Sequence, residues 1–497
     1  MLSDSPFRHN WLRLGVEILA SPNEKKRSNI GLNLLILKVK LTCSVQTKLL
    51  RSAHLADLLE EDLGTWRRTH YSVDINPNLN ESEIIIMGWV SSIRDHGNIK
   101  FLTINDRFGQ IQIALKKKDC SKAVLEKTEQ IKEHSSIAIK GKVKSEIKAP
   151  NGAEILPNEI KILSLARKAS PFLIQSRKSV GIDTRLDLRA LDLRRPFLQS
   201  LFNIRNTVMD SCREFLRKDG FMEVNTPKII ATATEGGAAL FPIFYYEREA
   251  FLAQSPQLYK EQLTMAFENV FEIGPIFRAE PSRTNRHLSE ATSIDVEKAF
   301  SDYNDVMNLL ERMLSYAVTK IQENNKPFLE YLNITLPDVS LPLRRYRYSE
   351  LIEMLQNAGE SIKWGDDLAF QKLQKIQDAK VDSFYFITDW PTAIKPFYVK
   401  PRSTVANECE SFDLMYKSLE VSSGSTRVSR KEELVERMKK QGLNIGAFDY
   451  HLKVFDYGVP PHAGFGVGME RLIMSLCGVE NIRDVVLYPR DIDRLSP

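Results

Sequence analysis

Hydrophobic and polar residues alternate over residues 83–116, where two turn sequences, Asp-His-Gly-Asn and Asp-Arg-Phe-Gly, separate three predicted strands. A helix-like segment follows at 121–134, and two more predicted strands occupy 136–145 and 159–166. Five strands with a helix after the third are the pattern of an OB-fold barrel, and such barrels bind single-stranded nucleic acid on one face. A structural barrel that binds nothing would show the same pattern.

The apolar positions change to a helical spacing after Pro196. One amphipathic helix is predicted over 196–218, and a short strand over 221–224 stops before Pro227. The apolar positions of the helix are Leu201, Ile204, Val208, Cys212 and Phe215. The rest of the chain mixes strands and helices without regular βαβ alternation, and it contains neither GxGxxG nor GxxxxGKS/T. The predicted class is α+β, an antiparallel sheet flanked by helices, and not a Rossmann fold.

These patterns divide the chain into four parts. Residues 1–66 form an N-terminal extension of unknown role, 67–166 the barrel, 167–195 a charged linker and 196–497 the second domain. Acidic and basic residues interrupt the apolar runs of the extension, so it lacks the clean core of a secretory signal. A transit peptide, a loosely ordered extension and a misassigned start stay open as alternatives.

The composition limits the expected partners and the expected compartment of the protein. Lysine and arginine total 69 against 64 for aspartate and glutamate, and this net charge of +5 is compatible with a nucleic-acid partner without requiring one. The five cysteines are far apart and never form CxxC pairs, which argues against a disulfide scaffold or zinc ribbon and favours a reducing, cytoplasmic setting. No run approaches the roughly 20 apolar residues that cross a bilayer, so no membrane association is expected.

Charged and small residues gather in three otherwise apolar segments. The first, 277–297, is predicted to form a strand, a polar loop and a strand; its arginines could grip phosphate and its glutamates could bind Mg²⁺. A salt-bridged surface hairpin would carry the same residues. The second, 464–471, has three alternating glycines and then Arg471 in the first turn of a helix. A cation is unfavourable there, so a phosphate or purine contact is expected, unless the segment is only a close-packed turn.

The third segment is 420–427. Glu420 and Ser423 would face opposite sides of a regular strand, unless a bulge intervenes, and Gly424 favours such a bulge. The Gly-rich stretch 234–237 is predicted to be a lid.

Taken in order, these segments resemble the motifs of class II aminoacyl-tRNA synthetases. The FRAE…RH…E hairpin is similar to their motif 2, GFGVGMER to motif 3, and the long helix with its strand and Pro227 to motif 1, the dimer element. A barrel before such a core resembles subclass IIb. The strings ATATEGG, LAQSPQLYK, RALDLRRP, FITDWP and DRLSP resemble aspartyl-tRNA synthetases of the archaeal and eukaryotic type. The resemblance implies that a homodimer attaches L-aspartate to tRNA(Asp) through an aspartyl-adenylate, using ATP and Mg²⁺.

The resemblance also implies residue roles. Arg278 would be catalytic, because it bridges the α-phosphate and the substrate carboxylate. The residues that would contact ATP are Arg278, Glu280, Arg286, His287, Glu420 and Arg471. Those that would contact aspartate are Glu235, Gln257, Lys260, Ser293, Asp295, Ser423 and Arg427, with Lys260 and Arg427 on its side-chain carboxylate. Glu420 and Ser423 would hold Mg²⁺. An aromatic residue often closes the adenine pocket in this family, but Ala291 and Thr292 follow Glu290 here, so adenine would be held differently.

In this family the barrel reads the anticodon. Phe101 would stack on a base, and Arg94 and Gln112 would reach base edges, although Phe101 could instead belong to the barrel core. Ser91 and Pro150 align with places where enzymes strict for tRNA(Asp) tend to have a bulky aromatic residue and a lysine. The chain lacks both, and so resembles relaxed enzymes that also charge tRNA(Asn).

Two alternatives stay open. An asparaginyl-tRNA synthetase would have less need of Lys260, and such enzymes usually differ within QSPQLYK. A catalytically inactive paralogue that only binds tRNA would have no reason to keep its catalytic residues. Those present are Arg278, Glu280, Glu420, Arg427 and Arg471.

Overall fold

The computed structural model describes residues 59–174, 180–232, 240–368, 372–374 and 383–497. The described residues form two compact units, which divide between Pro171 and Phe172. Among the described residues, no helix combines the length and the apolarity that crossing a membrane requires. The predicted lid and Glu235 lie outside the described residues.

The first unit contains a closed barrel with the strand order β1-β2-β3-β5-β4. Its elements are β1 (Glu83–Asp95), β2 (Ile99–Asn105), β3 (Gln110–Lys116), α2 (Lys122–Gln130), β4 (Ser136–Ser145) and β5 (Ala153–Ser164). The predicted OB-fold barrel is therefore confirmed. Strand β5 begins six residues before the predicted start (159 − 153). Pro157 concealed that part of the strand, because proline usually marks a bulge, and the ladder does shift register where Pro157 meets Gly141.

The second unit is built on a sheet of eight described strands in the order β12-β13-β14-β15-β16-β11-β10-β6. Pairing is antiparallel except at the two edges, where β12 runs parallel to β13 and β6 parallel to β10. The strands are β6 (Met222–Glu223), β10 (Asn269–Phe277), β11 (Glu290–Ala299), β12 (Arg344–Arg347), β13 (Phe384–Thr388), β14 (Ser411–Tyr416), β15 (Leu419–Thr426) and β16 (His462–Gly468). A smaller sheet contains β7 (Ile229–Ile230), β8 (Pro242–Tyr245) and β9 (Arg248–Leu252).

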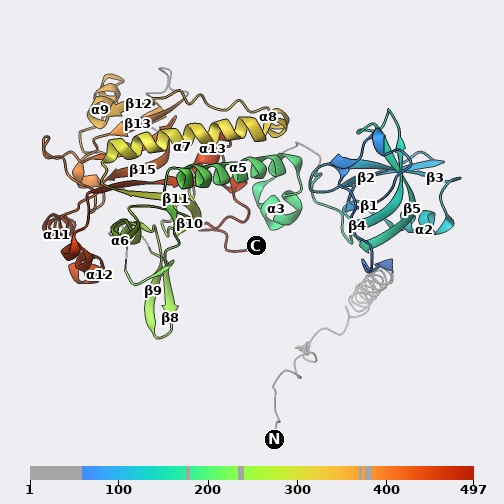
Figure 1. Cartoon of the computed structure of the whole chain (residues 1–497), viewed down its shortest axis with the longest axis horizontal. Coiled ribbons are helices and arrows are strands. Elements are labelled where there is room, and N and C mark those ends of the chain that lie inside the picture. Colours follow the sequence, from blue (N-terminus) through green and yellow to red (C-terminus); the bar gives the residue numbers. More distant parts are fainter. Residues whose placement is uncertain (1–58, 175–179, 233–239, 369–371, 375–382) are drawn as a thin grey trace, which may run out of the picture. The chain divides into compact units, whose positions relative to one another are not determined.

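Helices cover both faces of the large sheet. Their bounds are α3 (Ile182–Asp187), α4 (Arg189–Asp192), α5 (Pro196–Lys218), α6 (Gln257–Phe267), α7 (Tyr303–Asn324), α8 (Lys326–Leu332), α9 (Tyr348–Asn357), α11 (Lys431–Lys440), α12 (Asp449–Leu452) and α13 (Met469–Cys477). Figure 1 shows α5 and α7 side by side along the sheet. The predicted α+β class is confirmed, and α5 has the predicted bounds because Pro196 occupies its first turn and Asp219 caps its end.

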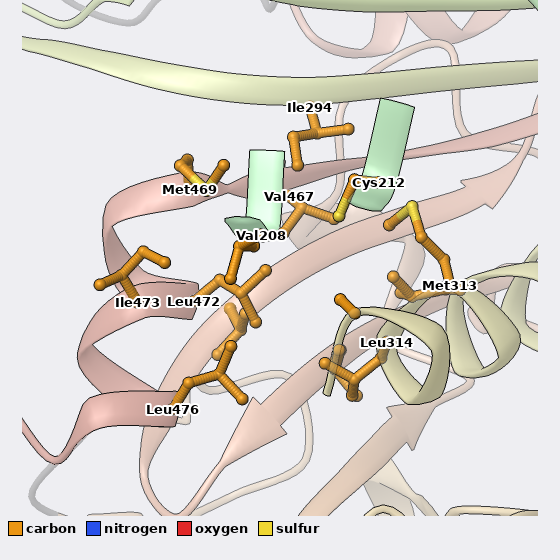
Figure 2. Close-up of a cluster of buried hydrophobic side chains, with 14 of the residues drawn as sticks. Val208, Cys212, Ile294, Met313, Leu314, Val467, Met469, Leu472, Ile473 and Leu476 are labelled. Carbon is orange, nitrogen blue, oxygen red and sulfur yellow. The ribbon is translucent and has the colours of Figure 1, made fainter. Parts of the chain in front are cut away.

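The main apolar core lies between the sheet and helices α5, α7 and α13 (Figure 2). Ile294 of β11 and Val467 of β16 point into this core from the sheet, where they meet Cys212 of α5 and Leu472 of α13. Because side chains alternate along a strand, the neighbours of Ile294 and Val467 face the opposite side of the sheet. That opposite face carries the polar cavity described next.

Candidate active site

A cavity of about 460 Å³ opens on the polar face of the large sheet, between α6 and the first turn of α13. Most of the predicted site residues line it: Gln257, Lys260, Arg278, Arg286, His287, Ser293, Asp295, Glu420, Ser423, Arg427 and Arg471. Glu280 is not among the lining residues; it is exposed in the loop after β10. The fold thus gathers residues from segments that are more than 200 positions apart in the sequence.

The strand register explains this gathering. Ser423 of β15 pairs with Asp413 of β14 on one side and with Gly466 of β16 on the other, and Gly466 in turn pairs with Asp295 of β11. One row of paired residues across the sheet therefore supplies carboxylates, a hydroxyl and a glycine to the same face. The missing side chain at Gly466 leaves room between the neighbouring polar groups, as the alternating glycines had indicated.

A bulge brings Glu420 onto this face. The register of β14 and β15 shifts between Leu414 and Met415, which leaves Val421 as the extra residue. Glu420 and Ser423 consequently face the same cavity, which a regular strand would forbid. The sequence predicted a bulge but placed it at Gly424. Gly424 is needed instead for close packing, because a Cβ there would lie 2.3 Å from the Phe412 ring.

One end of the cavity contains paired buried charges. The Lys260 ammonium lies 3.0 Å from Asp295 Oδ1 and 3.4 Å from Glu297 Oε2, and the Arg427 Nε lies 2.9 Å from Glu297 Oε1. All four residues are at most 5% exposed. Burial alone would lower the pKa of Arg427, but Glu297 outweighs burial and raises it. Arg427 is therefore held charged, and the paired carboxylates hold both basic side chains in place, which suits recognition of a carboxylate.

Glu297 is a site residue that the sequence did not single out. It is fully buried and touches both Lys260 and Arg427, yet it does not line the cavity. A Cβ on Gly464 would lie 2.3 Å from its carboxylate, so the first glycine of the GFGVG stretch makes room for Glu297. Its position two residues after Asp295 on the same strand face was the signal that could have found it.

The other end of the cavity is rich in arginine. Burial lowers the pKa of Arg471, and Arg278 and Arg286 lower it further, while Glu420 raises it. Burial and these same three arginines also lower the pKa of His287. Arginines that lower each other's pKa lie close enough to repel, so this end suits a polyanion such as a triphosphate.

A pair of carboxylates lies beside these arginines. Burial and the neighbouring Glu420 raise the pKa of Asp413, although Lys395, 2.8 Å away, opposes the rise. Asp413 also escaped the sequence analysis, because it sits within the apolar strand Ser-Phe-Asp-Leu-Met-Tyr. Two adjacent carboxylates and the Ser423 hydroxyl are the hard oxygen ligands that Mg²⁺ prefers. No group of three or more His, Cys, Asp or Glu that could hold a metal exists in the described part of the chain, so phosphate and water oxygens would have to complete the shell.

Small residues line the wall where an aromatic residue was expected. Ala291 and Thr292 line the cavity, and Glu470 of α13 accepts a hydrogen bond from the Thr292 amide at 3.0 Å. Arg205 of α5 binds the same Glu470 carboxylate at 3.1 Å. Glu470, the acidic residue of GFGVGMER, therefore ties α13 to β11 and α5, and it shapes the wall beside the arginine-rich end.

The barrel carries the predicted anticodon residues on its outer surface. Phe101 is only partly buried, whereas its neighbours Leu102 and Ile104 are core residues, which argues against the core alternative. The Arg94 guanidinium lies 5.6 Å from the centre of the Phe101 ring and donates to Gln112 at 2.9 Å.

Three further barrel residues, Glu154, Ser91 and Pro150, lie in or near the predicted anticodon surface. Gln112 donates to the buried Glu154 at 3.1 Å, and the sequence analysis did not find this acid. Ser91 is the bulge residue of β1, and Pro150 is exposed in the turn between β4 and β5.

The chain was compared with known proteins. Residues 181–492 match the family "tRNA synthetases class II (D, K and N)", and residues 84–163 match the "OB-fold nucleic acid binding domain". The Aspartate–tRNA(Asp/Asn) ligase of Methanococcus aeolicus is 48% identical over 436 residues, which cover 88% of this chain and 99% of that protein. The ligase of the same name from Methanocaldococcus jannaschii is 47% identical over 433 residues, covering 87% and 99%.

Solved structures show the same likeness. The asparaginyl-tRNA synthetase from Pyrococcus horikoshii, complexed with asparaginyl-adenylate, has a TM-score of 0.82 at 31% identity, covering 87% of this chain and all of that one. The aspartyl tRNA synthetase from Entamoeba histolytica has a TM-score of 0.77 at 30% identity, covering 88% and 94%.

Fold, cavity and similarity agree: the chain belongs to the class II tRNA synthetases of the D, K and N group. Within that group, the curated relatives described above are ligases named for aspartate and for tRNA(Asp/Asn). The family and fold that the sequence motifs predicted are thereby confirmed.

Proposed function

We propose that this protein is an aspartate–tRNA ligase that activates L-aspartate with ATP and transfers it to tRNA. The observation that carries the proposal is the pair Lys260 and Arg427, buried and charged at one end of a cavity whose other end is rich in arginine. A dicarboxylic amino acid needs a second cationic contact beyond the one that serves its α-carboxylate. The 46–48% identity to ligases named for aspartate supports the same choice.

Activation requires positioning rather than a side-chain nucleophile. The α-carboxylate of aspartate attacks the α-phosphorus of ATP in line, and pyrophosphate leaves. Arg278 stabilises the charge that develops at phosphorus, while Arg286, His287 and Arg471 hold the remaining phosphates and the adenine side of the nucleotide. Glu280 contacts ATP from the loop after β10. The terminal adenosine hydroxyl of tRNA then takes the aspartyl group from the adenylate.

The aspartate contacts follow from the cavity. Lys260 and Arg427 bind the side-chain carboxylate, and Gln257, Ser293, Asp295 and Ser423 surround the rest of the amino acid. Glu420, Ser423 and Asp413 would hold Mg²⁺, which when bound neutralises phosphate charge and orients the triphosphate.

We further propose relaxed tRNA choice, a homodimer and a cytoplasmic location. Ser91 and Pro150 leave the surface around the last anticodon base without an aromatic residue or a lysine, which supports charging of both tRNA(Asp) and tRNA(Asn). The motif 1 elements α5 and β6 support the dimer. The described cysteines are free thiols, as a reducing compartment would require.

Amino-acid-dependent ATP–pyrophosphate exchange tests the activation step. Purified protein with Mg²⁺ and ATP is expected to exchange with aspartate and not with asparagine. Exchange with asparagine alone would identify an asparaginyl-tRNA synthetase. Exchange with neither would identify an inactive paralogue.

Charging assays test tRNA choice. Aspartylation of both tRNA transcripts is expected for the wild-type protein. The double variant Ser91→Trp with Pro150→Lys should lose tRNA(Asn) charging selectively. Absence of tRNA(Asn) charging by the wild-type protein would contradict the proposal of relaxed choice.

A further inference from the structure

A second buried charge cluster lies directly beneath the amino-acid end of the cavity. Glu261 of α6 is 1% exposed, and the two histidines His451 of α12 and His462 of β16 are fully buried. Glu261 Oε2 lies 3.4 Å from His451 Nε2 and 3.8 Å from His462 Nε2. These three atoms are buried and have no other hydrogen-bond partner among the described residues, so they face one another.

Hydrogen-bond geometry assigns the protons of this cluster. His462 Nδ1 lies 2.8 Å from the carbonyl oxygen of Pro460, and a carbonyl only accepts, so Nδ1 carries a hydrogen. His462 Nε2 lies 3.8 Å from the Glu261 carboxylate, which stabilises a second hydrogen on this atom and thereby the cationic form of the ring. His451 Nδ1 lies 3.2 Å from the amide nitrogen of Gln262, which donates to it. This contact occupies Nδ1 as an acceptor and leaves His451 Nε2 to direct a hydrogen toward Glu261.

The charge surroundings agree with that assignment. Burial would lower the pKa of His462, but Glu261 outweighs burial, Glu297 adds to the effect, and the pKa is raised. Three titratable groups face His462: Glu261 from α6, Glu297 from β11 and His451 from α12. Arg427, which follows β15, is also adjacent, because its backbone amide donates a hydrogen bond to the His462 carbonyl oxygen. Because its pKa is raised, the imidazolium persists to higher pH than that of an ordinary histidine and is lost as the pH rises through the raised value.

The cluster is connected to the cavity through Gln257. The Gln257 amide nitrogen donates to Glu261 Oε1 at 2.6 Å and lies 3.5 Å from Glu297 Oε2. Both amide hydrogens thus face carboxylates, which leaves the carbonyl oxygen of Gln257 as the atom available to the cavity that it lines. A carbonyl oxygen in that place accepts a hydrogen bond from a substrate ammonium.

We propose that Glu261, His451 and His462 form a protonated layer that positions Gln257 and sets the charge beneath the pocket, so that the enzyme selects an amino acid with a second carboxylate. The proposal rests on the proposed aspartate activation. With His462 charged, the cations Lys260, Arg427 and His462 balance the anions Asp295, Glu297 and Glu261. Loss of the His462 proton leaves a net negative charge beneath the site, which repels the substrate side chain.

The test measures the KM for aspartate and the kcat of pyrophosphate exchange by the full-length protein, from about pH 5.5 to about pH 8.5. For the wild-type protein, the KM should rise about tenfold across this range while kcat changes about twofold or less. The variant Glu261→Gln keeps the side-chain shape but removes the charge that holds the proton. With Glu261 and His462 both neutral, Lys260 and Arg427 still balance Asp295 and Glu297, so its KM should stay near the low-pH value of the wild-type protein and be independent of pH. His462→Gln leaves Glu261 without a balancing cation, so its KM should be about tenfold higher and also independent of pH.

Matched controls separate this effect from simple loss of structure. Glu436→Gln makes the same chemical change on the surface of α11, where Glu436 pairs with Lys440 at 2.7 Å, and its profile should coincide with that of the wild-type protein. The inhibition constant of asparagine, whose side chain is neutral, should not follow pH. A wild-type KM for aspartate that is independent of pH, or a Glu261→Gln profile parallel to it, would overturn the proposal.

A direct titration distinguishes failure of this proposal from failure of the proposed function. In NMR spectra of histidine-labelled protein, the His462 signal, identified by its loss in His462→Gln, should titrate above the ordinary value of about 6.5, and below it in Glu261→Gln. If no amino acid supports exchange, the proposed function fails and this titration still tests the cluster. An ordinary or lowered His462 pKa in the wild-type protein would refute the proton assignment.

Discussion

At the amino-acid end of the cavity, Lys260 and Arg427 each lie against a carboxylate; at the nucleotide end, Arg278, Arg286 and Arg471 lie near one another. The first end is buried and its geometry is fixed before any substrate arrives. The second is more exposed, and its cations are neutralised only in part by Glu420. The difference teaches that one end is built for selectivity between similar small molecules, and the other for attraction of a highly charged one.

The largest expected effect comes from the arginine-rich end. Replacement of Arg278 by alanine should lower kcat/KM of pyrophosphate exchange about 10³-fold, since it removes charge stabilisation at the reacting phosphorus. The KM for aspartate should change far less. Arg312→Ala, which removes a surface arginine paired with Asp219 at 3.1 Å, serves as the control and should retain full activity. A loss below about tenfold for Arg278→Ala would deny the residue its catalytic role.

At the amino-acid end, the expected effect of a substitution is a loss of folding stability. Glu297→Gln leaves Lys260 and Arg427 buried without their shared partner, and the free energy of unfolding should fall by about 3–5 kcal/mol. Urea unfolding followed by circular dichroism measures the change. Asp219→Asn removes a partly exposed carboxylate that pairs with a surface arginine, and it should cost about 1 kcal/mol or less. Equal losses for the two variants would mean that burial of the ion pairs is energetically unimportant.

A substitution in the barrel should affect tRNA binding without affecting either end of the cavity. Phe101→Ala should raise the KM for tRNA in aminoacylation about tenfold, because a base loses its stacking surface, while pyrophosphate exchange stays unchanged. Phe101→Tyr keeps an aromatic ring and should restore most of the affinity. Unaltered aminoacylation by Phe101→Ala would remove Phe101 from the tRNA interface.

The smallest expected effect is proton uptake by His287 when ATP binds at the nucleotide end of the cavity. Burial and the neighbouring arginines lower the pKa of His287, so the free protein holds this ring neutral to lower pH than an ordinary histidine. Bound ATP would partly cancel the arginine charges, raise that pKa and draw in a fraction of a proton below about pH 6.5. Calorimetric titrations of ATP in buffers of different ionisation enthalpy measure this uptake. His287→Asn should abolish it, and uptake that persists in this variant would assign the proton elsewhere.

The effect of His287 on stability has a definite sign. Because its folded pKa lies below the unfolded value, the unfolded chain binds more protons between the two values. The contribution of the neutral ring is fully present above the unfolded pKa and is lost as the pH falls through the folded pKa.

The sequence predicted those parts of the site that depend on local pattern. The motif resemblance assigned Ser293 and Asp295 to the amino-acid site, and the fold places both on the cavity face of β11, with Ile294 in the apolar core. Glu297 was missed because its role exists only through Lys260 and Arg427, and Arg427 lies 130 residues further along the chain. Asp413 was missed because apolar neighbours make its strand appear to belong wholly to the core.

The sequence predicted that β15 contains a bulge, but it indicated the wrong residue. Glycine is permissive of irregular backbone, so Gly424 was the natural candidate. The actual position at Val421 is decided by how β14 and β15 pair, which involves residues on both strands and leaves no mark in either alone. Pairwise register of this sort is tertiary information, as are the buried partners of Lys260 and Gln112.

The bulge at Val421 also limits how this region can evolve or be redesigned. Loss of the extra residue would restore a regular ladder and keep Glu420 and Ser423 on one face, whereas gain of one residue would send one of the two to the apolar face. Homologues should therefore have no insertion between these two positions, even where their turns differ in length. Anyone transplanting this active site into another scaffold would have to carry the irregular strand pair as one piece.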